Sequence, residues 1–391
     1  MTSGRRTAIT VLIVLVGLAT GVVAAQNRSV APAEWNREGA AKYLDDRMDV
    51  WTARGKKLRT GQGEATCVSC HTVVPYALAR PALRRGMRVP TPTPQEARLL
   101  QDVIRRTETH DTHQPYYDST ELKSVQSRGT EAVLNALILA SADAERDRRE
   151  PSEPTQRAFR HLWQTQRHDG TWDWLDFNLE PFESADAAYY GATLAAMAVG
   201  TAGAASTTPS AAAADGMSRL RGYLTERYAA QNLFNRVSLL LASTRWNDVL
   251  TRPQREALVA ELRRGQHEDG GWSLRGMAGW RWSKNTWRAS PPGTPDAALL
   301  AKSDGYATGL VIYTLRRTGV QTDDPAIARG VRWLKAHQES VQVGDRAYPA
   351  WRAYSLNHDR EHGEDRGEPW RRLFMSDAAT AYAVLALLAA E

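Results

Sequence analysis

The stretch that decides the fold is residues 162–172, which read Leu-Trp-Gln-Thr-Gln-Arg-His-Asp-Gly-Thr-Trp. A second copy, residues 262–272, reads Leu-Arg-Arg-Gly-Gln-His-Glu-Asp-Gly-Gly-Trp. A third copy, residues 329–351, passes through Gln338 and reaches its Trp only after a longer loop. A degenerate copy, which lacks the Gly-x-Trp ending, lies at residues 221–224. Self-similarity at a spacing of tens of residues predicts a repeat architecture.

Each copy closes an amphipathic segment such as residues 254–264, which is charged on one face and is expected on the outside. The three clearer copies are followed by segments rich in Ala, Leu and Gly, which are expected to be buried helices. These segments are residues 186–194, 304–310 and 377–383. Asp-Gly makes the turn between the two helices. We expect the Gln amide to bond exposed helix-end groups and the indole to cover the turn.

The pattern Gln-x-x-Asp-Gly-x-Trp resembles the QW repeat of squalene–hopene cyclases, and more broadly the prenyltransferase and squalene oxidase repeat. The resemblance covers roughly residues 153–391. It implies an all-α fold, the α/α toroid, in which outer helices ring inner ones. It is specific for the fold and says little about the reaction.

The hydrophobic pattern extends the count to six outer–inner helix pairs, enough to close a ring. The pairs are 35–54 with 76–85, 94–107 with 127–140, 155–166 with 186–199, 218–230 with 234–243, 253–266 with 304–316, and 324–337 with 377–389. Residues 200–215, nearly all Ala, Ser, Thr, Gly and Pro, are predicted to be a loop.

Both cysteines of the chain lie in Cys67-Val68-Ser69-Cys70-His71, which is the attachment pattern of c-type haem. The pattern predicts one covalent haem held by both thiols, with His71 as the proximal iron ligand. A thioredoxin-like motif would need a preceding strand and a βαβ context, and neither is expected here. A zinc site would need two more ligands, and no other cysteine is present. A disulfide between the two cysteines would close a very small ring.

Residues 1–25 are predicted to be a targeting segment. Arg5 and Arg6 precede the apolar residues 8–19, and small residues end the segment at 23–25. This ending favours a cleaved signal peptide over an uncleaved anchor through residues 8–25, although that stretch is about long enough to span a bilayer. We therefore expect a periplasmic or otherwise exported protein, as haem attachment in bacteria requires.

The predicted organisation follows. Residues 1–25 are the signal peptide or anchor, residues 30–90 hold the haem-attachment segment and first helix pair, and residues 91–391 hold the toroid repeats. The haem motif falls between the first outer and first inner helix. We expect the haem at the mouth where inner helices begin, under long connections that open onto the same face. These connections are residues 107–119, 177–184, 273–303 and 348–376.

Tryptophan is unusually frequent, with thirteen Trp against five Phe. Trp280, Trp282 and Trp287 lie in one of these connections, where they serve the site or only shield the haem from water. The sixth iron ligand has several candidates by residue type, and His110 and His113 lead because their loop should fall beside the first inner helix. The candidates are His110, His113, His358, His362, Met277, Met375 and Met87. An open sixth position would instead allow small-molecule chemistry.

Asp186, Asp304 and Asp377 recur at matching places before or in the inner helices. They are interpreted as helix caps or, as weak catalytic candidates, as a carboxylate ring at the mouth. Class II terpenoid cyclases use an Asp-x-Asp-Asp run, which this chain lacks, so protonation-initiated cyclisation is disfavoured. Prenyltransferases of this fold use a zinc site made of Asp, Cys and His. Both cysteines of this chain lie in the haem motif, so that activity is disfavoured too.

The sequence favours an exported mono-haem c protein on a terpenoid-cyclase-like toroid. Its predicted task is electron transfer, or haem-based oxidation of an apolar substrate, with isoprenoids implied by fold resemblance alone. One alternative is a non-enzymatic redox or binding module of a periplasmic complex. Another is a periplasmic α/α-barrel glycan lyase or hydrolase with a structural haem. The net charge is +6, and no run of like charges marks a nucleic-acid surface. The expected partner is a redox protein, with the basic balance favouring an acidic one, or a small apolar substrate.

Overall fold

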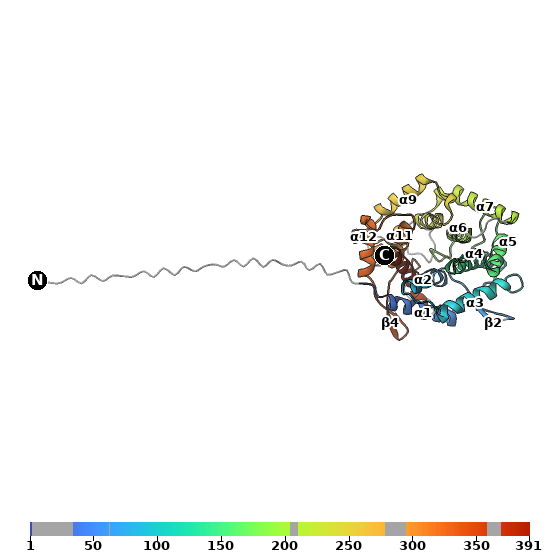
Figure 1. The fold of residues 1–391 in the computed structure, drawn as a ribbon, viewed down its shortest axis with the longest axis horizontal. Helices are drawn as coiled ribbons and strands as arrows, with labels where there is room; N and C mark the ends of the chain where they lie inside the picture. The colour runs from blue at the N-terminus through green and yellow to red at the C-terminus, as the bar shows by residue number, and fades with distance from the viewer. Residues whose placement is uncertain (2–33, 62, 204–209, 278–294, 358–368) are drawn as a thin grey trace. The chain divides into compact units, whose positions relative to one another are not determined.

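The computed structural model describes residues 1, 34–61, 63–203, 210–277, 295–357 and 369–391. Residues 34–391 form one compact unit that is mostly helical, as the sequence predicts (Figure 1). The strands among the described residues form two antiparallel hairpins. Several predicted features lie outside the described residues. They are the targeting segment at residues 2–25, Trp280, Trp282, Trp287, His358 and His362.

Six helices rich in buried residues form the core. They are α2 (Val73–Gly86), α4 (Glu121–Glu145), α6 (Ala187–Gly203), α8 (Leu233–Ser243), α11 (Gly305–Arg317) and α14 (Phe374–Ala389). Each packs against the next in this order, and α14 packs against α2. The packing order of the buried helices therefore closes on itself.

Six further helices carry charged residues on their outer faces. They are α1 (Arg37–Arg54), α3 (Pro94–Glu108), α5 (Glu153–Gln164), α7 (Ala211–Arg227), α9 (Arg252–Arg264) and α12 (Pro325–Ala336). Helices α3, α5, α7, α9 and α12 each pack on the buried helix that precedes them in the chain, and α1 packs on α14. Figure 1 shows these helices at the rim, with α2, α4, α6 and α11 inside them. All twelve predicted helices are present.

Some boundaries differ from the prediction. Helix α4 begins at Glu121, six residues before the expected start at Ser127. Residues Ala211 to Asp215, predicted as loop, form the start of α7, because Ser210 caps the helix and accepts a hydrogen bond from the Ala213 amide. The alanines that follow are strong helix formers, so the low complexity of this stretch concealed a helix.

A short helix and two hairpins were not predicted. The helix is α10 (Pro295–Ala301). The first hairpin pairs β1 (Lys57–Thr60) with β2 (Gly63–Thr66), and the second pairs β3 (Glu339–Val343) with β4 (Arg346–Ala350). The second hairpin is the longer loop of the third repeat copy, and it packs on α1.

The repeat tryptophans share one structural role. The indole N–H of Trp172 donates to the Leu162 carbonyl, and that of Trp272 donates to the Leu262 carbonyl, both at 2.8 Å. Trp351 donates to Leu334 O at the same distance, despite the inserted hairpin. Each indole is buried and satisfies a carbonyl near the end of an outer helix. The third copy is therefore structurally equivalent to the first two.

The repeat glutamines join one repeat to the next. The Gln166 amide donates to Gly170 O and to Gly216 O on α7, at 3.1 and 3.0 Å. Gln266 donates to Gly270 O and to Ala326 O on α12, both at 2.8 Å. The two turn glycines have φ values of 88° and 94°, a left-handed conformation that favours glycine. These hydrogen bonds and the glycine conformation explain why the two copies share the same spacing of Gln, Gly and Trp.

Candidate functional site

The Cys67–His71 motif, for which we predict haem attachment, lies between β2 and α2, in the connection of the first helix pair, as predicted. The prediction that no strand precedes it is wrong, because β2 ends directly before Cys67. The Cys67 amide donates to Lys56 O at 2.9 Å, and the Tyr116 hydroxyl donates to Ala65 O at 3.2 Å. The first bond extends the pairing of the two strands, and the second holds the hairpin to the segment between α3 and α4. A βαβ unit is still missing, since the described strands pair only as antiparallel hairpins.

Both thiols of the motif are buried, and neither is in a disulfide. Burial, reinforced by the Glu183 carboxylate, raises the pKa of the Cys67 thiol to about 12. Burial also raises the pKa of the Cys70 thiol well above its usual value. A redox-active dithiol needs the opposite shift, since the thiolate is the nucleophile. The environment therefore opposes thioredoxin-like chemistry at these residues.

The His71 imidazole is anchored through one of its nitrogens. Its Nδ1 lies 2.8 Å from the Thr72 hydroxyl oxygen, and that hydroxyl lies 2.7 Å from Asp377 Oδ2. The hydroxyl has a single proton, which it donates to the carboxylate, so it accepts a hydrogen bond from Nδ1–H. In a neutral imidazole with this bond, the lone pair is on Nε2, the nitrogen through which such a histidine binds a metal.

The Asp377 carboxylate accepts hydrogen bonds from several side chains of this network. The Arg47 guanidinium donates to both of its oxygens, at 2.6 and 2.9 Å, and the Tyr43 hydroxyl donates at 2.9 Å. The two charged side chains are each 2% exposed. The predicted cap role of Asp377 is wrong, because α14 begins at Phe374 and Asp377 lies inside its first turn. The buried ion pair instead ties α1 to α14, and the Thr72 hydroxyl links His71 to the same carboxylate.

The other two aspartates have separate surroundings. Asp304 caps α11, as predicted, and accepts hydrogen bonds from the amides of Ala307 and Leu274 at 2.8 and 2.6 Å. Burial raises its pKa to about 6, against the lowering effect of these amides. Asp186 precedes α6, and its carbonyl accepts a hydrogen bond from the Asn235 amide. The three residues therefore do not share one role.

Aromatic rings enclose His71. The Phe374 ring stacks on it with centroids 3.8 Å apart, and the Trp51 ring meets it edge-on at 5.2 Å. A small cavity of about 40 Å³ lies beside the imidazole. Its lining is His71, Leu179, Glu180, Phe182, Glu183, Ser355, Asn357, Arg371, Arg372, Phe374 and Met375. Two of the predicted connections, residues 177–184 and 348–376, thus meet at the motif.

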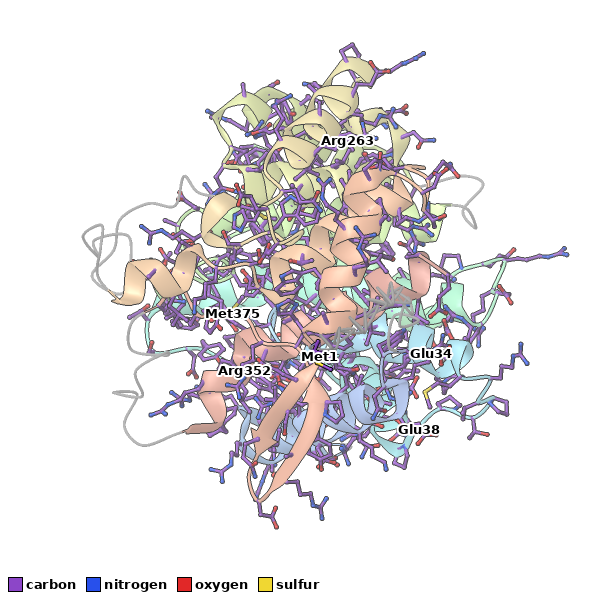
Figure 2. The ribbon with its side chains drawn as sticks, turned by 90° about the vertical axis from the view of Figure 1, so that its left-hand side faces the viewer. Met1, Glu34, Glu38, Arg263, Arg352 and Met375 are labelled. Carbon is purple, nitrogen blue, oxygen red and sulfur yellow. The ribbon has the colours of Figure 1, made fainter. Side chains whose placement is uncertain are left out.

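Among the candidate sixth ligands, the structure brings Met375 to this cavity; its position at the start of α14 is labelled in Figure 2. Met87 follows the last residue of α2, about 20 Å along the helix axis from the end that carries His71, so the prediction that it could ligate the iron is wrong. Met277 is buried in the short 3-10 helix Arg275–Met277. His110 packs against His161 of α5, and His113 lies on the same turn as His110.

The donor set fits a covalent haem. Two unbridged thiols flank an imidazole whose Nδ1 is already anchored, and Arg371 and Arg372 line the same cavity, where they could pair with the haem carboxylates. The volume of about 40 Å³ is too small for a porphyrin. A haem held by these residues would therefore need more room than this cavity provides.

A much larger cavity, of about 1310 Å³, has a lining that the sequence did not predict. It is lined by α2 and α3 and by the C-terminal turns of α4, α6 and α8, with mostly aliphatic side chains and several arginines. Leu385 of α14 lines it, whereas Met375 of the same helix lines the small cavity. Ten residues of helix place the two cavities about 15 Å apart along α14.

A column of aromatic rings connects the two cavities. Phe182, from the small cavity, lies 5.7 Å from the Tyr306 ring. Tyr306 lies 5.3 Å from Tyr382, and Tyr382 lies 6.5 Å from Tyr313, which lines the large cavity. Burial, followed by the Tyr382 and Asp304 charges and then by Cys70, raises the pKa of Tyr306 well above its usual value. The column therefore starts beside the motif.

One described helical stretch, Trp370–Ala389, is long and apolar enough to cross a membrane. Its apolar window is 72% buried inside the fold, which is typical of a core helix. No protein-family model matches the chain, and no curated protein matches its sequence.

Proposed function

We propose that the protein is an exported electron-transfer protein that carries one covalent haem c on Cys67 and Cys70, with His71 as the proximal iron ligand. The observation that carries the proposal is the network His71–Thr72–Asp377–Arg47 beside two buried, unbridged thiols. Metal-ligating histidines characteristically donate their other ring N–H to an oxygen that is itself held in place. If the two cysteines formed a redox or structural pair, the histidine after them would not need a hydrogen bond that fixes its ring.

The fold in this proposal is the α/α toroid that the repeat resemblance implies. Its support is the closed packing order of the six buried helices, with an outer helix on each. The equivalent indole bonds of Trp172, Trp272 and Trp351 support the repeat. The motif then occupies the turn of the first repeat.

Each residue around the motif has a physical task in the proposal. Thr72 and the Asp377 carboxylate orient the His71 ring and increase the basicity of its Nε2. Trp51 and Phe374 exclude water, which strengthens the electrostatic interactions inside the site. Arg371 and Arg372 supply positive charge at the cavity edge. When bound, the haem would supply one-electron redox chemistry, with a potential that depends on these surroundings.

Two observations favour electron transfer over oxidation of a substrate at the iron. The iron would lie near His71, whereas the cavity that would hold an apolar molecule, of about 1310 Å³, lies about 15 Å away along α14. The rings of Phe182, Tyr306 and Tyr382 lie between them. A redox-active apolar molecule in the large cavity, itself oxidised or reduced by one electron, would therefore exchange electrons with the site without touching it.

Carbon monoxide reactivity tests this choice. The protein is matured in a host with c-type haem assembly, reduced, and exposed to carbon monoxide. We expect a low-spin spectrum that carbon monoxide does not change within minutes, because Met375 lies at the cavity and can close the sixth position. The Met375→Ala variant should become reactive. Rapid binding by the unchanged protein would favour haem-based oxidation instead.

A further inference from the structure

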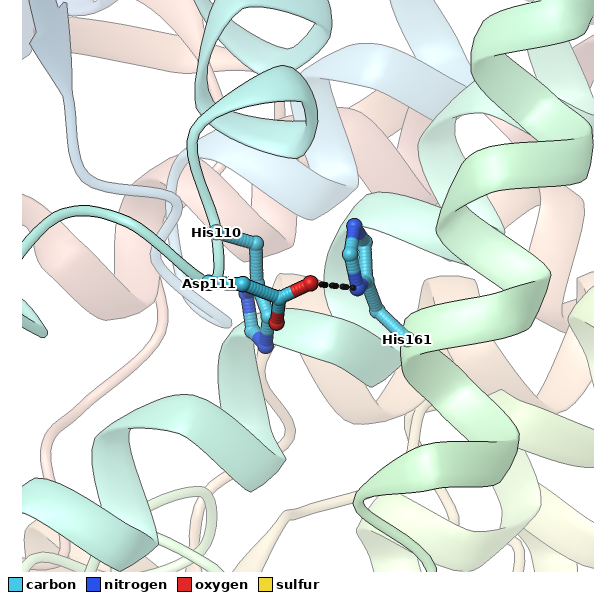
Figure 3. Close-up of side chains that lie close together, drawn as sticks. All are labelled: His110, Asp111 and His161. Carbon is cyan, nitrogen blue, oxygen red and sulfur yellow. Dashed lines mark ion pairs between the residues drawn. The ribbon is translucent and has the colours of Figure 1, made fainter.

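A second cluster of ligand-type side chains lies away from the cysteines. His110 and Asp111 are on the turn after α3, and His161 is in the last turn of α5. Each offers one ligand atom, and these atoms all lie within 4.8 Å of one another. Figure 3 shows the three side chains converging, with the Asp111 carboxylate next to the His161 ring. Two neighbouring outer helices thus meet at a His-Asp-His group.

The hydrogen bonds of His161 leave one nitrogen suited to a metal. Its Nε2 lies 3.0 Å from the Thr107 carbonyl oxygen, which can only accept, so Nε2 carries the proton. Nδ1 then carries the lone pair, and it lies 3.6 Å from Asp111 Oδ2. The Gln164 side chain is 3.3 Å from the same nitrogen and can present its amide N–H there. A backbone carbonyl that fixes the tautomer is the usual support of a metal-ligating histidine.

His110 adds a buried nitrogen with no partner. Its side chain is 2% exposed, and within the described part of the chain its Nε2 has no hydrogen-bond partner. Burial, followed by His161, Arg106 and Arg128, lowers the pKa of His110 to about 3. An unsatisfied nitrogen on a buried imidazole calls for an explanation, and a metal ion supplies one.

The charged side chains around the His-Asp-His group include two arginines and two carboxylates. Arg106 pairs with the buried Glu131 carboxylate, which lies 4.0 Å from His110 Nδ1. Arg128 donates to the carbonyls of His110 and His113. The Asp111 carboxylate, with 67% of its side chain exposed, offers the remaining negative charge and opens the group to solvent. A dication entering between the rings would meet Asp111 first.

We propose that His110, Asp111 and His161 bind one divalent transition-metal ion of the zinc class, independently of the haem. Two imidazoles and a carboxylate are ligands that zinc prefers, with water in the remaining position. Neighbouring ligand atoms of a tetrahedral zinc site lie about 3.3 Å apart, close to the 3.6 Å between Asp111 and His161. The ion would tie the turn after α3 to α5.

The test uses the full chain with its haem in place, stripped of other metals by a chelator and titrated with zinc chloride. We expect one zinc bound per chain, and a zinc-edge X-ray absorption spectrum with two imidazole ligands, which iron does not obscure. Asp111→Asn should weaken zinc binding about tenfold or more. His161→Gln should do the same. Zinc should raise the melting temperature of the unchanged protein and not that of Asp111→Asn.

Matched controls are His113→Gln, on the same turn, and His168→Gln, an exposed histidine just beyond α5. Both should bind zinc like the unchanged protein. Asp111→Asn should melt like the unchanged protein when no zinc is present, because its carboxylate is exposed. The proposal is overturned if the unchanged protein binds no zinc, if Asp111→Asn binds it equally well, or if His113→Gln loses it.

Discussion

Thr72 donates a hydrogen bond of 2.7 Å to Asp377, a residue 305 positions later in the chain. Through this bond the residue next to the Cys67–His71 motif is held by the last core helix. The same carboxylate binds Arg47 of the first helix, so three distant segments meet at one buried charge. The orientation of His71 therefore depends on the closure of the whole fold.

Replacing Thr72 by Val removes the hydroxyl and keeps the shape. Asp377 then loses one hydrogen bond and His71 loses its Nδ1 acceptor, so we expect a loss of about 1–3 kcal/mol in the free energy of unfolding. The reduced spectrum and the reduction potential of the haem should also shift. Thr52→Val, which removes a hydroxyl bonded only within α1, is the control and should leave the spectrum unchanged.

Replacing Arg47 by Met leaves the Asp377 carboxylate buried without its ion-pair partner. We expect a loss of roughly 3–5 kcal/mol, measured by urea denaturation, because an uncompensated buried charge is strongly destabilising. The double variant Arg47→Met with Asp377→Asn should lose less than the sum of the single changes. Additive losses would mean that the two side chains are not coupled.

The repeat tryptophans should be among the most sensitive positions. Trp172→Ala and Trp272→Ala each leave a cavity and an unsatisfied carbonyl at the end of an outer helix, so each should cost roughly 3–5 kcal/mol. Trp246→Ala, at a half-buried indole outside the repeat pattern, should cost less. If the midpoints of denaturation barely move while ligand binding falls, these indoles serve a substrate instead.

The thiols should react slowly in folded chain that lacks haem. With a pKa of about 12, the Cys67 thiolate is ~1,000-fold rarer at pH 8 than that of an ordinary thiol with a pKa of about 8.5. Even with its greater intrinsic nucleophilicity, alkylation by iodoacetamide should be about 50-fold slower than in urea-unfolded chain. Fast alkylation of the folded chain below pH 9 would contradict the buried environment.

The raised pKa of the Cys67 thiol makes the stability of the folded chain depend on pH. The pKa of the Cys67 thiol is raised in the folded state, so its contribution to stability is fully present below the unfolded pKa of about 8.5 and is lost as the pH rises toward 12. The unfolding free energy of the haem-free chain should therefore fall over this range. The Cys67→Ala variant should show a shallower fall.

The helices could be predicted because the Gln-Asp-Gly-Trp turns and the apolar segments are local signals. The hairpin β1–β2 could not, since Lys57 to Thr66 contains few β-branched or aromatic residues and depends on tertiary contacts such as that of Tyr116. The hairpin β3–β4 was hidden in what the sequence presents as a long loop.

The site was predicted in part. Cys67, Cys70 and His71 form a local motif, and the meeting of residues 177–184 and 348–376 at His71 follows from the repeat order. Arg47 was missed because a charged residue on an outer helix indicates solvent exposure, yet it is buried against α14. Long-range pairs of this kind leave no periodic signal in the sequence.

His161 was missed for the same reason. It is one residue on an amphipathic helix, and the position of its partner His110 in the chain makes that residue a candidate sixth ligand of the haem instead. The structure places the two rings 4.5 Å apart between outer helices, which the sequence spacing alone does not reveal.

Covalent attachment of the haem tests the central claim most directly. Protein matured in a host with c-type haem assembly is extracted with acid–acetone and then analysed by denaturing gel and intact mass. We predict that the red colour stays with the chain, that the mass is that of the polypeptide plus one haem, and that both are lost in the Cys67→Ala, Cys70→Ala double variant. Haem that extracts freely from the unchanged protein, or a polypeptide mass without haem, would contradict the account.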